Sequence, residues 1–465
     1  MNKLTKIVAT IGPASDSLEI IEKLILAGVD IFRFNFKHNT VEWHNERIGR
    51  VNLVAKKLGR TVATLIDLQG PEIRINMPVE ELKIENGELI IFGPEAFNTK
   101  EKAFSISHPQ IIPHLKAGQK IVADNGAFLF GVIKKRGRTY LQSQVNGVLK
   151  NHKSVNVPGA DFPFPVLVDR DFEGLKLAQR NQIDFVALSF VRTAGDIGIL
   201  KKEMGKYKVT AKVIAKIETK KALANLETII DVSDGIMVAR GDLGVELPIE
   251  EVPYYQKIII KESIKRSVPV ITATQMLESM VEKIYPTRAE VSDIANATYD
   301  LTDAVMLSAE TAIGHYPEKT VAVMAKTAAF NENKNPVDNR VRFNFRLKDT
   351  ESVLCDNAYG LYLKLRQLGQ SPAGFLVFTR SGRTARLISR YRPLIPIFAF
   401  SANEKSACTL TVNFGVVPLF ESVIAGKEVD KKEIAAAINL LKKRQLIKTG
   451  QSLIVVQSKR LAVYE

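Results

Sequence analysis

The chain has 465 residues, a length that accommodates about three domains with separate hydrophobic cores. Hydrophobic residues make up 46% and charged residues 25%, and the mean hydropathy is close to zero, which excludes an intrinsically disordered chain and a multi-span membrane protein. The 65 basic residues exceed the 50 acidic ones and give a net charge of +15, which favours anionic partners such as nucleic acid, acidic membranes or phosphorylated metabolites.

The first residues and the cysteines indicate a cytoplasmic protein. Residues 1–10 contain only a short apolar run before Gly12-Pro13, which is typical of a first β-strand and not of a signal peptide. Cys355 and Cys408 are too few for a disulfide framework and lack metal-ligand spacing, so we expect a reducing compartment.

Short apolar runs rich in β-branched residues alternate with helix-like segments, a pattern typical of parallel strands covered by helices on both faces. Eight such strand–helix units are the number needed to close a (β/α)8 TIM barrel, the fold class predicted for this α/β chain. The predicted strands are Lys6 to Ile11, Val29 to Phe34, Thr61 to Leu68, Asp184 to Phe190, Lys212 to Ile217, Gly235 to Ala239, Pro269 to Thr274 and Ala304 to Ser308.

The spacing breaks once, because more than a hundred residues separate Leu68 from Asp184. Within this insertion, short strand-like runs are joined by the turn signals Glu85-Asn86-Gly87, Asp124-Asn125-Gly126 and Lys135-Arg136-Gly137. Residues 76–157 therefore predict an inserted small β-barrel domain. Because an insertion after a barrel strand lies over the active face, we expect this domain to act as a lid.

A polar stretch at residues 331–336 marks the end of the barrel, which then comprises residues 1–75 and 158–335. Residues 336–465 predict a C-terminal α/β domain with a regulatory role. Its strand-like runs and its clearest helix are Gly374 to Phe378, Ile395 to Phe400, Val416 to Phe420, Leu453 to Val456, and the helix Lys431 to Lys443.

Polar side chains follow the predicted barrel strands, where barrel enzymes place their chemistry. The second strand ends near Arg33 and the third near Asp67, and Thr274 ends the seventh. Lys216 and Glu218 end the fifth strand, and their i, i+2 spacing puts both on one side of an extended chain.

Two of these strand ends carry carboxylates that together predict a magnesium (Mg²⁺) site. Gly241 and Asp242 follow the sixth strand in a turn that opens a short helix, whose N–H groups suit an anion. Asp242 and Glu218 form a carboxylate pair of the kind that binds Mg²⁺ together with water and substrate oxygens.

Each of these features has a purely structural interpretation. A single Lys-x-Glu is often a solvated strand face, a Gly-Asp is often only a turn, and Arg33 with Asp67 could be a structural ion pair. A barrel without catalytic function, however, has no reason to place Arg, Lys, two acids and a Thr on one rim. We therefore interpret the strand ends as one catalytic site.

In these motifs the sequence resembles the pyruvate kinase family over nearly the whole barrel, in family order. The insertion and the C-terminal domain also fall where that family has them. The matching stretches are Thr10 to Ser15, Arg33 to Phe36, Gly70 to Arg74, Val155 to Gly159, Ser189 to Arg192, Ala215 to Glu218, Asp234 to Gly244, Ala273 to Met280, Pro286 to Asp293 and Met306 to Ala312.

The resemblance implies a homotetrameric glycolytic enzyme that transfers the phosphoryl group of phosphoenolpyruvate to ADP, giving pyruvate and ATP, with Mg²⁺ as cofactor. It implies that Arg33 and Lys216 bind the transferred phosphate and that Lys216 also stabilises the enolate. Glu218 and Asp242 would hold the Mg²⁺.

The resemblance also implies the remaining substrate contacts. The backbone of Gly241 and Asp242 would bind the substrate carboxylate, and Thr274 would lie beside it and help to protonate the enolate, through water. The residues implied to face the nucleotide are Asn35, His38, Arg74 and Lys153.

The chain departs from the family at the site where many members bind potassium through Asn, Ser, Asp and Thr. Asn35 and Asp67 are kept, but Lys37 replaces the Ser and Leu68 replaces the Thr. An ammonium about 4 Å from Asp67 would gain about 4 kcal/mol at an effective dielectric of 20, before desolvation.

We therefore hypothesise that the Lys37 ammonium lies in or near the potassium site and makes the enzyme independent of K⁺. Leu68-Gln69 resembles members that work without K⁺, although their built-in lysine usually occupies the position of Glu72. The alternative is that Lys37 points to solvent and the cation site is damaged.

A hydroxyl-rich turn in the C-terminal domain resembles the family's effector-phosphate loop. Its residues are Thr379, Arg380, Ser381, Gly382, Arg383 and Thr384. Ser458-Lys459 joins the last two predicted strands, Leu453 to Gln457 and Leu461 to Tyr464, almost directly. Members activated by fructose 1,6-bisphosphate have a long loop there, so we expect a sugar-monophosphate or nucleotide effector, or none.

Three other functions remain open from the sequence. An aldolase or mutase on a similar barrel would generally lack the lid and the C-terminal domain. A catalytically altered homologue with a binding or regulatory role is made possible by the changed cation site. A nucleic-acid binder is suggested only by charge, since no recognition motif is evident and Trp43 is the only tryptophan. We expect neither a nucleic acid nor a membrane as partner.

Overall fold

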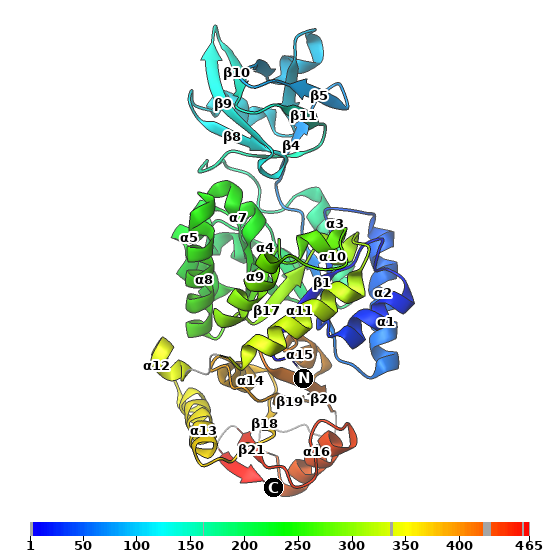
Figure 1. The fold of residues 1–465 in the computed structure, drawn as a ribbon, viewed down its shortest axis with the longest axis vertical. Coiled ribbons are helices and arrows are strands. Elements are labelled where there is room, and N and C mark those ends of the chain that lie inside the picture. The colour runs from blue at the N-terminus through cyan, green and yellow to red at the C-terminus, as the bar shows by residue number, and fades with distance from the viewer. Residues whose placement is uncertain (1–2, 161, 335–337, 422–428, 458–459, 465) are drawn as a thin grey trace.

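The computed structural model describes residues 3–160, 162–334, 338–421, 429–457 and 460–464. Three parts follow one another along the long axis of the molecule, with the inserted domain at one end, a barrel in the middle and the C-terminal domain at the other end (Figure 1). Within the described residues, no helix is both long and apolar enough to cross a lipid bilayer.

The central part is a closed barrel of eight parallel strands in the order β1-β17-β16-β15-β14-β13-β3-β2, which confirms the predicted TIM barrel. Most of these strands are buried along their whole length because helices cover the outside and side chains fill the inside. The strands are β1 Lys6–Thr10, β2 Ile31–Asn35, β3 Ala63–Asp67, β13 Phe185–Leu188, β14 Lys212–Ile217, β15 Gly235–Ala239, β16 Val270–Ala273 and β17 Ala304–Leu307.

Several helices around the barrel begin at side-chain caps. The hydroxyl of Ser17 accepts from Ile20 N at the start of α1, Thr40 accepts from Trp43 N at the start of α2, and Thr287 forms a capping box with Glu290 at the start of α9. These helices are α1 Leu18–Ala27, α2 Val41–Leu58, α3 Asp169–Arg180, α4 Ala194–Lys206, α5 Lys220–Ala224, α6 Leu226–Val232, α7 Arg240–Glu246, α8 Val252–Arg266, α9 Arg288–Tyr299, α10 Ala309–Ala312 and α11 Pro317–Glu332, with 3-10 turns η4 Ile249–Glu251 and η5 Glu278–Val281.

The inserted domain is a second closed barrel, of order β10-β6-β7-β4-β12-β8-β9, with a two-stranded β11-β5 sheet beside it. Its strand β4 begins at Ile73, a few residues before the predicted start at 76. The elements are β4 Ile73–Asn76, β5 Glu81–Ile84, β6 Leu89–Phe92, η1 Pro94–Asn98, β7 Ala103–Ile106, η2 Pro109–His114, β8 Lys120–Ala123, η3 Asp124–Gly126, β9 Phe128–Lys135, β10 Arg138–Ser143, β11 Gly147–Lys150 and β12 Ser154–Asn156.

The C-terminal domain has one sheet of order β20-β19-β18-β21-β22, in which only β22 is antiparallel to its neighbour. The predicted boundary at 335/336 and the connection Ser458-Lys459 lie outside the described residues. The elements are α12 Asn339–Phe343, α13 Thr350–Gln367, β18 Gly374–Phe378, α14 Arg383–Ser389, β19 Ile397–Ser401, α15 Glu404–Thr409, β20 Val416–Phe420, α16 Lys431–Lys443, β21 Leu453–Gln457 and β22 Arg460–Tyr464.

Ion pairs fasten this domain to the amino-terminal ends of the barrel strands. Asp303, just before β17, pairs with Arg392 at 2.6 Å, and both side chains are almost fully buried. Asp184, just before β13, pairs with Lys405 at 3.2 Å. The C-terminal domain therefore covers the base of the barrel, and the carboxyl ends of the strands face the lid (Figure 1).

Candidate active site

A buried carboxylate, Asp67, organises the cations at the carboxyl ends of β2, β3 and β14. Asp67 is 1% exposed, and its Oδ2 lies 2.7 Å from Nη2 of Arg33 while its Oδ1 lies 3.3 Å from Nζ of Lys216. Burial opposes the charge of Asp67, but Lys216 and Arg33 outweigh it and lower the pKa of the carboxyl. The predicted ion pair of Arg33 with Asp67 is thus present, and it fixes the guanidinium at the rim.

Lys216 and Glu218 point into the same space, as their spacing predicts. Nζ of Lys216 lies 2.7 Å from Oε1 of Glu218 and donates to Oγ of Ser189 at 2.9 Å. Burial disfavours the ammonium, yet Asp67, Glu218 and Asp242 raise the pKa of Lys216, so it stays charged at neutral pH. A permanently charged lysine at this position can stabilise an anion, but it is a poor general base.

The donor set at Glu218 suits a divalent cation. Glu218 is 1% exposed, its Oε2 accepts from Phe190 N at 2.7 Å, and its Oε1 faces the Lys216 ammonium. Burial raises its pKa, and the nearby charge of Asp242 raises it further. A hard cation bound by both carboxylates would relieve this repulsion. Two carboxylates leave the remaining positions to water and substrate, as Mg²⁺ prefers.

Thr274 contacts the start of α7, and its backbone has a conformation that residues other than glycine rarely adopt. Its φ is 71°, and its hydroxyl accepts from Gly241 N at 2.8 Å, so the predicted carboxylate donor Gly241 N already has a partner. Arg240 fixes this turn because its guanidinium donates to the Thr274 carbonyl and pairs with Asp293 at 2.7 Å. The strained turn therefore aims the Thr274 hydroxyl at the short helix that begins with Arg240.

The predicted contact between Lys37 and Asp67 is wrong. Nζ of Lys37 lies 2.6 Å from Oε1 of Glu72, and the side chain is 29% exposed. Arg33, Lys216 and Ser189 already surround Asp67. The Lys37 side chain therefore extends to Glu72, the carboxylate at the base of the lid. Of the other expected cation ligands, Asn35 accepts from the backbone of Lys37 through Oδ1 at 3.4 Å.

The residues implied to face the nucleotide lie where the lid joins the barrel. Arg74 pairs with the same Glu72 at 3.0 Å, and Lys153 pairs with Asp124 of the lid at 2.9 Å. Burial and the nearby charges of Lys37, Arg74 and Arg33 lower the pKa of His38. The lid and barrel enclose a cleft of about 340 Å³ whose lining includes Glu72, Asn156, Arg192, Glu218 and Asp242.

Four residues with no predicted role support the site from behind. The Thr10 hydroxyl accepts from Arg33 at 2.9 Å, Ser189 contacts Lys216, Glu72 joins Lys37 to Arg74, and Arg240 holds the Thr274 turn. All four belong to the motifs that carry the family resemblance. That membership was the available signal, but the motifs alone could not tell supporting residues from substrate-binding ones.

The expected effector loop is partly occupied by the protein's own carboxylates. Arg383 pairs with Asp349 at 2.6 Å and also with Glu351, whose Oε1 accepts from the Thr384 hydroxyl at 2.6 Å. Thr379 is buried and Gly382 turns the chain at φ 78°. Only Arg380 and Ser381 remain exposed.

Comparisons with known proteins match two parts of the chain to family models. Residues 2–321 match the family described as "Pyruvate kinase, barrel domain", and residues 371–463 match "Pyruvate kinase, alpha/beta domain". Pyruvate kinases of Geobacillus stearothermophilus and of Staphylococcus aureus strain MRSA252 are each 41% identical to the chain over 422 residues, which cover 90% and 89% of this chain and 71% of each relative. A crystal structure of a pyruvate kinase from Cryptosporidium parvum superposes with a TM-score of 0.91 at 29% identity, covering 100% of this chain and 96% of the other.

Proposed function

The chain belongs to the pyruvate kinase family and is a phosphotransferase of glycolysis, and we propose that Arg33, Lys216, Glu218 and Asp242 form its phosphoryl-transfer site. One observation carries this proposal. The Lys216 ammonium is buried between Asp67, Glu218 and Ser189 at the strand ends that face the lid. A charged lysine held so rigidly is suited to a substrate whose negative charge moves during the reaction.

The transferred phosphate of phosphoenolpyruvate binds to Arg33 and Lys216. Phosphoryl transfer depends mainly on positioning and charge neutralisation, and both cations are held in place by Asp67 before substrate arrives. When the phosphate leaves for ADP, the enolate oxygen that remains is stabilised by the same Lys216.

Glu218 and Asp242 would hold Mg²⁺, which when bound neutralises phosphate charge and aligns the reacting oxygens. When Glu218 and Asp242 are both ionised without it, the three carboxylates of this cluster exceed its two cations by one negative charge, which repels an anionic substrate. The protein's own residues therefore bind substrate well only after a divalent cation is present.

The turn at Thr274 would bind the carboxylate end of phosphoenolpyruvate. The carboxylate of phosphoenolpyruvate would take the N–H groups of Gly241 and Asp242 and displace the bond between Gly241 and the Thr274 hydroxyl. The freed hydroxyl then passes a proton to the enolate through water. The ADP phosphates would lie near Arg74 and Lys153 of the lid and near Asn35 and His38 at the end of β2.

Lys37 replaces the monovalent cation by neutralising Glu72 from within the chain. The 2.6 Å pair and the partial burial of Lys37 support this, and they oppose the alternative in which the lysine points to solvent. K⁺ is then not required for turnover.

The regulatory and cellular properties follow the family. The enzyme is a cytoplasmic homotetramer, and exposed Arg380 and Ser381 are the groups of the Thr379–Thr384 loop available to a sugar-monophosphate or nucleotide effector. A catalytically altered homologue is disfavoured because the described site brings Arg33, Lys216, Glu218 and Thr274 to one rim.

A coupled assay with lactate dehydrogenase, phosphoenolpyruvate and ADP tests the site. Lys216→Met should lower kcat by at least about 100-fold, since it removes the main electrostatic stabiliser. Lys202→Met, which removes an exposed lysine of α4, is the matched control and should leave kcat unchanged. Wild-type turnover in Lys216→Met would contradict the assignment.

A further inference from the structure

The start of helix α3 contacts both the loop that follows β2 and the segment that enters the lid. The chain leaves β12 at Asn156 and enters α3 at Asp169. Arg170 and Asp171, in the first turn of α3, bond back to residues that follow β2 and β3. Neither side chain takes part in the proposed phosphoryl transfer, so their contacts need another explanation.

Arg170 clamps the β2–α2 loop, which comprises residues 36–39. Its Nε donates to the Phe36 carbonyl at 3.2 Å, and its Nη2 donates to the Asn39 carbonyl. The guanidinium carbon also lies 4.3 Å from the centre of the Phe36 ring. One planar guanidinium therefore holds the first and the last residue of the loop, which a single ammonium could not do in the same geometry.

The β2–α2 loop bends sharply and depends on side chains for its shape. Asn39 has a φ of 63°, a left-handed conformation that residues other than glycine rarely adopt. His44 of α2 adds a third donor, because its Nε2 donates to the His38 carbonyl at 2.8 Å. With three loop carbonyls held by α2 and α3, the Lys37 ammonium extends to Glu72 at the base of the lid.

Asp171 holds the segment by which the chain enters the lid. Its carboxylate is 0% exposed and accepts from Gln69 N at 2.8 Å, from Gly70 N at 3.2 Å and from Val168 N at 3.0 Å. A helix cap explains the bond from Val168. It does not explain the bonds from Gln69 and Gly70, which lie 102 and 101 residues earlier in the chain. One carboxylate therefore joins both chain crossings between the barrel and the lid.

The groups expected to bind phosphoenolpyruvate are held by other contacts. Asp67 fixes Arg33 and Lys216 at 2.7 and 3.3 Å. Among the described residues, the Arg170 side chain bonds only to Glu173 of its own helix and to the two loop carbonyls. Loss of Arg170 should therefore disturb the β2–α2 loop and leave the phosphoenolpyruvate groups in place.

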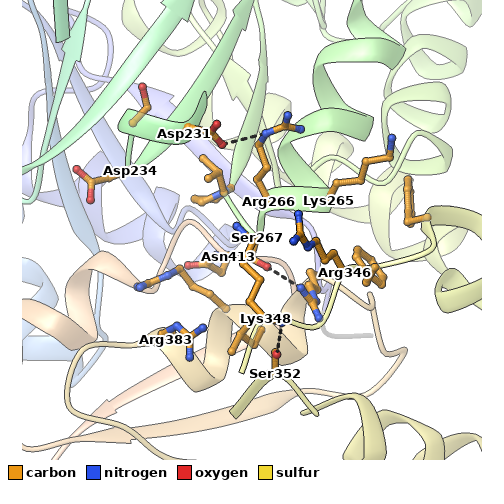
Figure 2. A pocket seen from close by; sticks show the side chains of 18 of the residues that line it. Asp231, Asp234, Lys265, Arg266, Ser267, Arg346, Lys348, Ser352, Arg383 and Asn413 are labelled. Carbon is orange, nitrogen blue, oxygen red and sulfur yellow. Dashed lines mark hydrogen bonds and ion pairs between the residues drawn. The ribbon is translucent and has the colours of Figure 1, made fainter. Parts of the chain in front are cut away.

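The start of α3 is also remote from the larger cavity of the molecule. That cavity, of about 720 Å³, lies between the base of the barrel and the C-terminal domain, with Arg266, Ser267, Lys348 and Ser352 around it (Figure 2). No residue of α3 is among the described residues that line it. Substitutions at the start of α3 therefore act at the lid end of the barrel.

We propose that Arg170 and Asp171 are positioning residues for ADP, because together they set the β2–α2 loop against the base of the lid. This inference rests on the proposed function, in which His38 and Arg74 bind the ADP phosphates. A loop without the clamp would keep its phosphate-binding side chains but lose the geometry in which they meet one ligand. ADP binding then weakens much more than phosphoenolpyruvate binding does.

Steady-state kinetics at saturating Mg²⁺, with each substrate varied in turn, test the role of Arg170. Arg170→Met keeps the apolar stem but removes the donors, so it should raise KM for ADP by at least about tenfold and KM for phosphoenolpyruvate by less than about twofold. Arg170→Lys keeps the charge but cannot bridge both carbonyls, and should give an intermediate KM for ADP. Arg180→Met removes an exposed arginine from the last turn of the same helix and should change neither KM.

Amide hydrogen exchange tests the role of Asp171. Asp171→Asn replaces one of the two acceptor oxygens by an amide, which leaves at least one of the three N–H groups without its partner. Peptides covering residues 66–72 and 165–172 should then exchange faster than in the wild type, and KM for ADP should rise. Glu433→Gln alters the equivalent cap residue of α16 in the C-terminal domain and should leave exchange in both peptides unchanged. Wild-type exchange in Asp171→Asn would contradict its role.

Two kinetic results would overturn the proposal: an unchanged KM for ADP in Arg170→Met, and an equal rise of both KM values, which would indicate general distortion of the site. His38→Ala separates this inference from the proposed function. An unchanged KM for ADP in His38→Ala would contradict the proposed nucleotide site, whereas a raised KM there with a wild-type KM in Arg170→Met would contradict the positioning role alone. Should Arg170→Met fail to fold, Arg170→Lys carries the same expectation with a smaller rise.

Discussion

The ammonium of Lys37 lies 2.6 Å from a carboxylate oxygen of Glu72 and links the end of β2 to the segment that enters the lid. Glu72 also pairs with Arg74 at 3.0 Å, so one carboxylate holds two cations at the hinge of the active-site cleft. Glu72 therefore connects Lys37, the proposed replacement for the monovalent cation, with Arg74, which is expected to bind the nucleotide phosphates.

Turnover should be the same in potassium and in tetramethylammonium buffers. Lys37→Ser removes the built-in cation and leaves Glu72 short of positive charge, so K⁺ should become an activator, more strongly when Leu68→Thr restores a hydroxyl ligand. The measurement is kcat against K⁺ concentration. Lys23→Ser breaks another 2.6 Å ion pair on the exposed surface of α1 and should not create a K⁺ response. Strong K⁺ activation of the wild type would contradict the proposal that Lys37 replaces the monovalent cation.

Asp67→Asn should destabilise the protein and lower activity together. Asp67 is the buried counter-charge of Arg33 and Lys216, and removing one partner of a buried ion pair costs about 3 kcal/mol. Urea unfolding and the coupled assay measure the two effects. Glu227→Gln, which breaks an exposed pair with Arg266, should change stability by no more than about 0.5 kcal/mol. An Asp67→Asn protein as stable as the wild type would contradict this role.

His44 should make stability depend on pH. It is 1% exposed among Phe34, Phe36 and Trp43, its Nε2 donates to the His38 carbonyl at 2.8 Å, and its Nδ1 has no hydrogen-bond partner in the described chain. Burial lowers its pKa from 6.5 to about 4, so the folded protein keeps it neutral.

Between pH 6.5 and 4 the unfolded chain binds a proton that the folded chain does not, so stability falls as the pH is lowered through this window. From pH 7 to pH 5 the loss due to His44 is about 2 kcal/mol. His44→Gln keeps the donor without titrating, and urea unfolding at both pH values should show a loss smaller by that amount. The exposed His315→Gln serves as control and should lose as much stability as the wild type.

The Thr274 hydroxyl should be needed for turnover and not for the fold. Thr274→Ala should lower kcat by about 100-fold if the hydroxyl helps to deliver the proton, whereas Thr274→Ser should retain most of the activity. Steady-state kinetics and thermal unfolding of both variants distinguish the roles. Equal losses in the two variants would point instead to disruption of the strained turn at φ 71°.

Local sequence patterns determined the barrel, because each strand is a short apolar run and parallel strands place their carboxyl ends on one rim. The positions of Arg33, Asp67, Lys216, Glu218 and Thr274 at strand ends followed directly. The spacing of Lys216 and Glu218 also predicted their common direction, and the structure confirms it with a 2.7 Å pair. The lid and the C-terminal domain could be predicted because a long insertion and a polar stretch interrupt the alternation of strands and helices.

Tertiary structure alone decided which charges meet. Whether Lys37 would reach Asp67 or Glu72 depended on the competition of Arg33 and Lys216 for Asp67, and that competition depends on distances between separate strands. In the same way, Asp349 and Glu351 neutralise Arg383 from α13 and its cap, while Arg386 of the same helix α14 donates to the Ser381 carbonyl. A sequence therefore fixes which charged residues lie on a strand or helix, but their pairing is set by packing between domains.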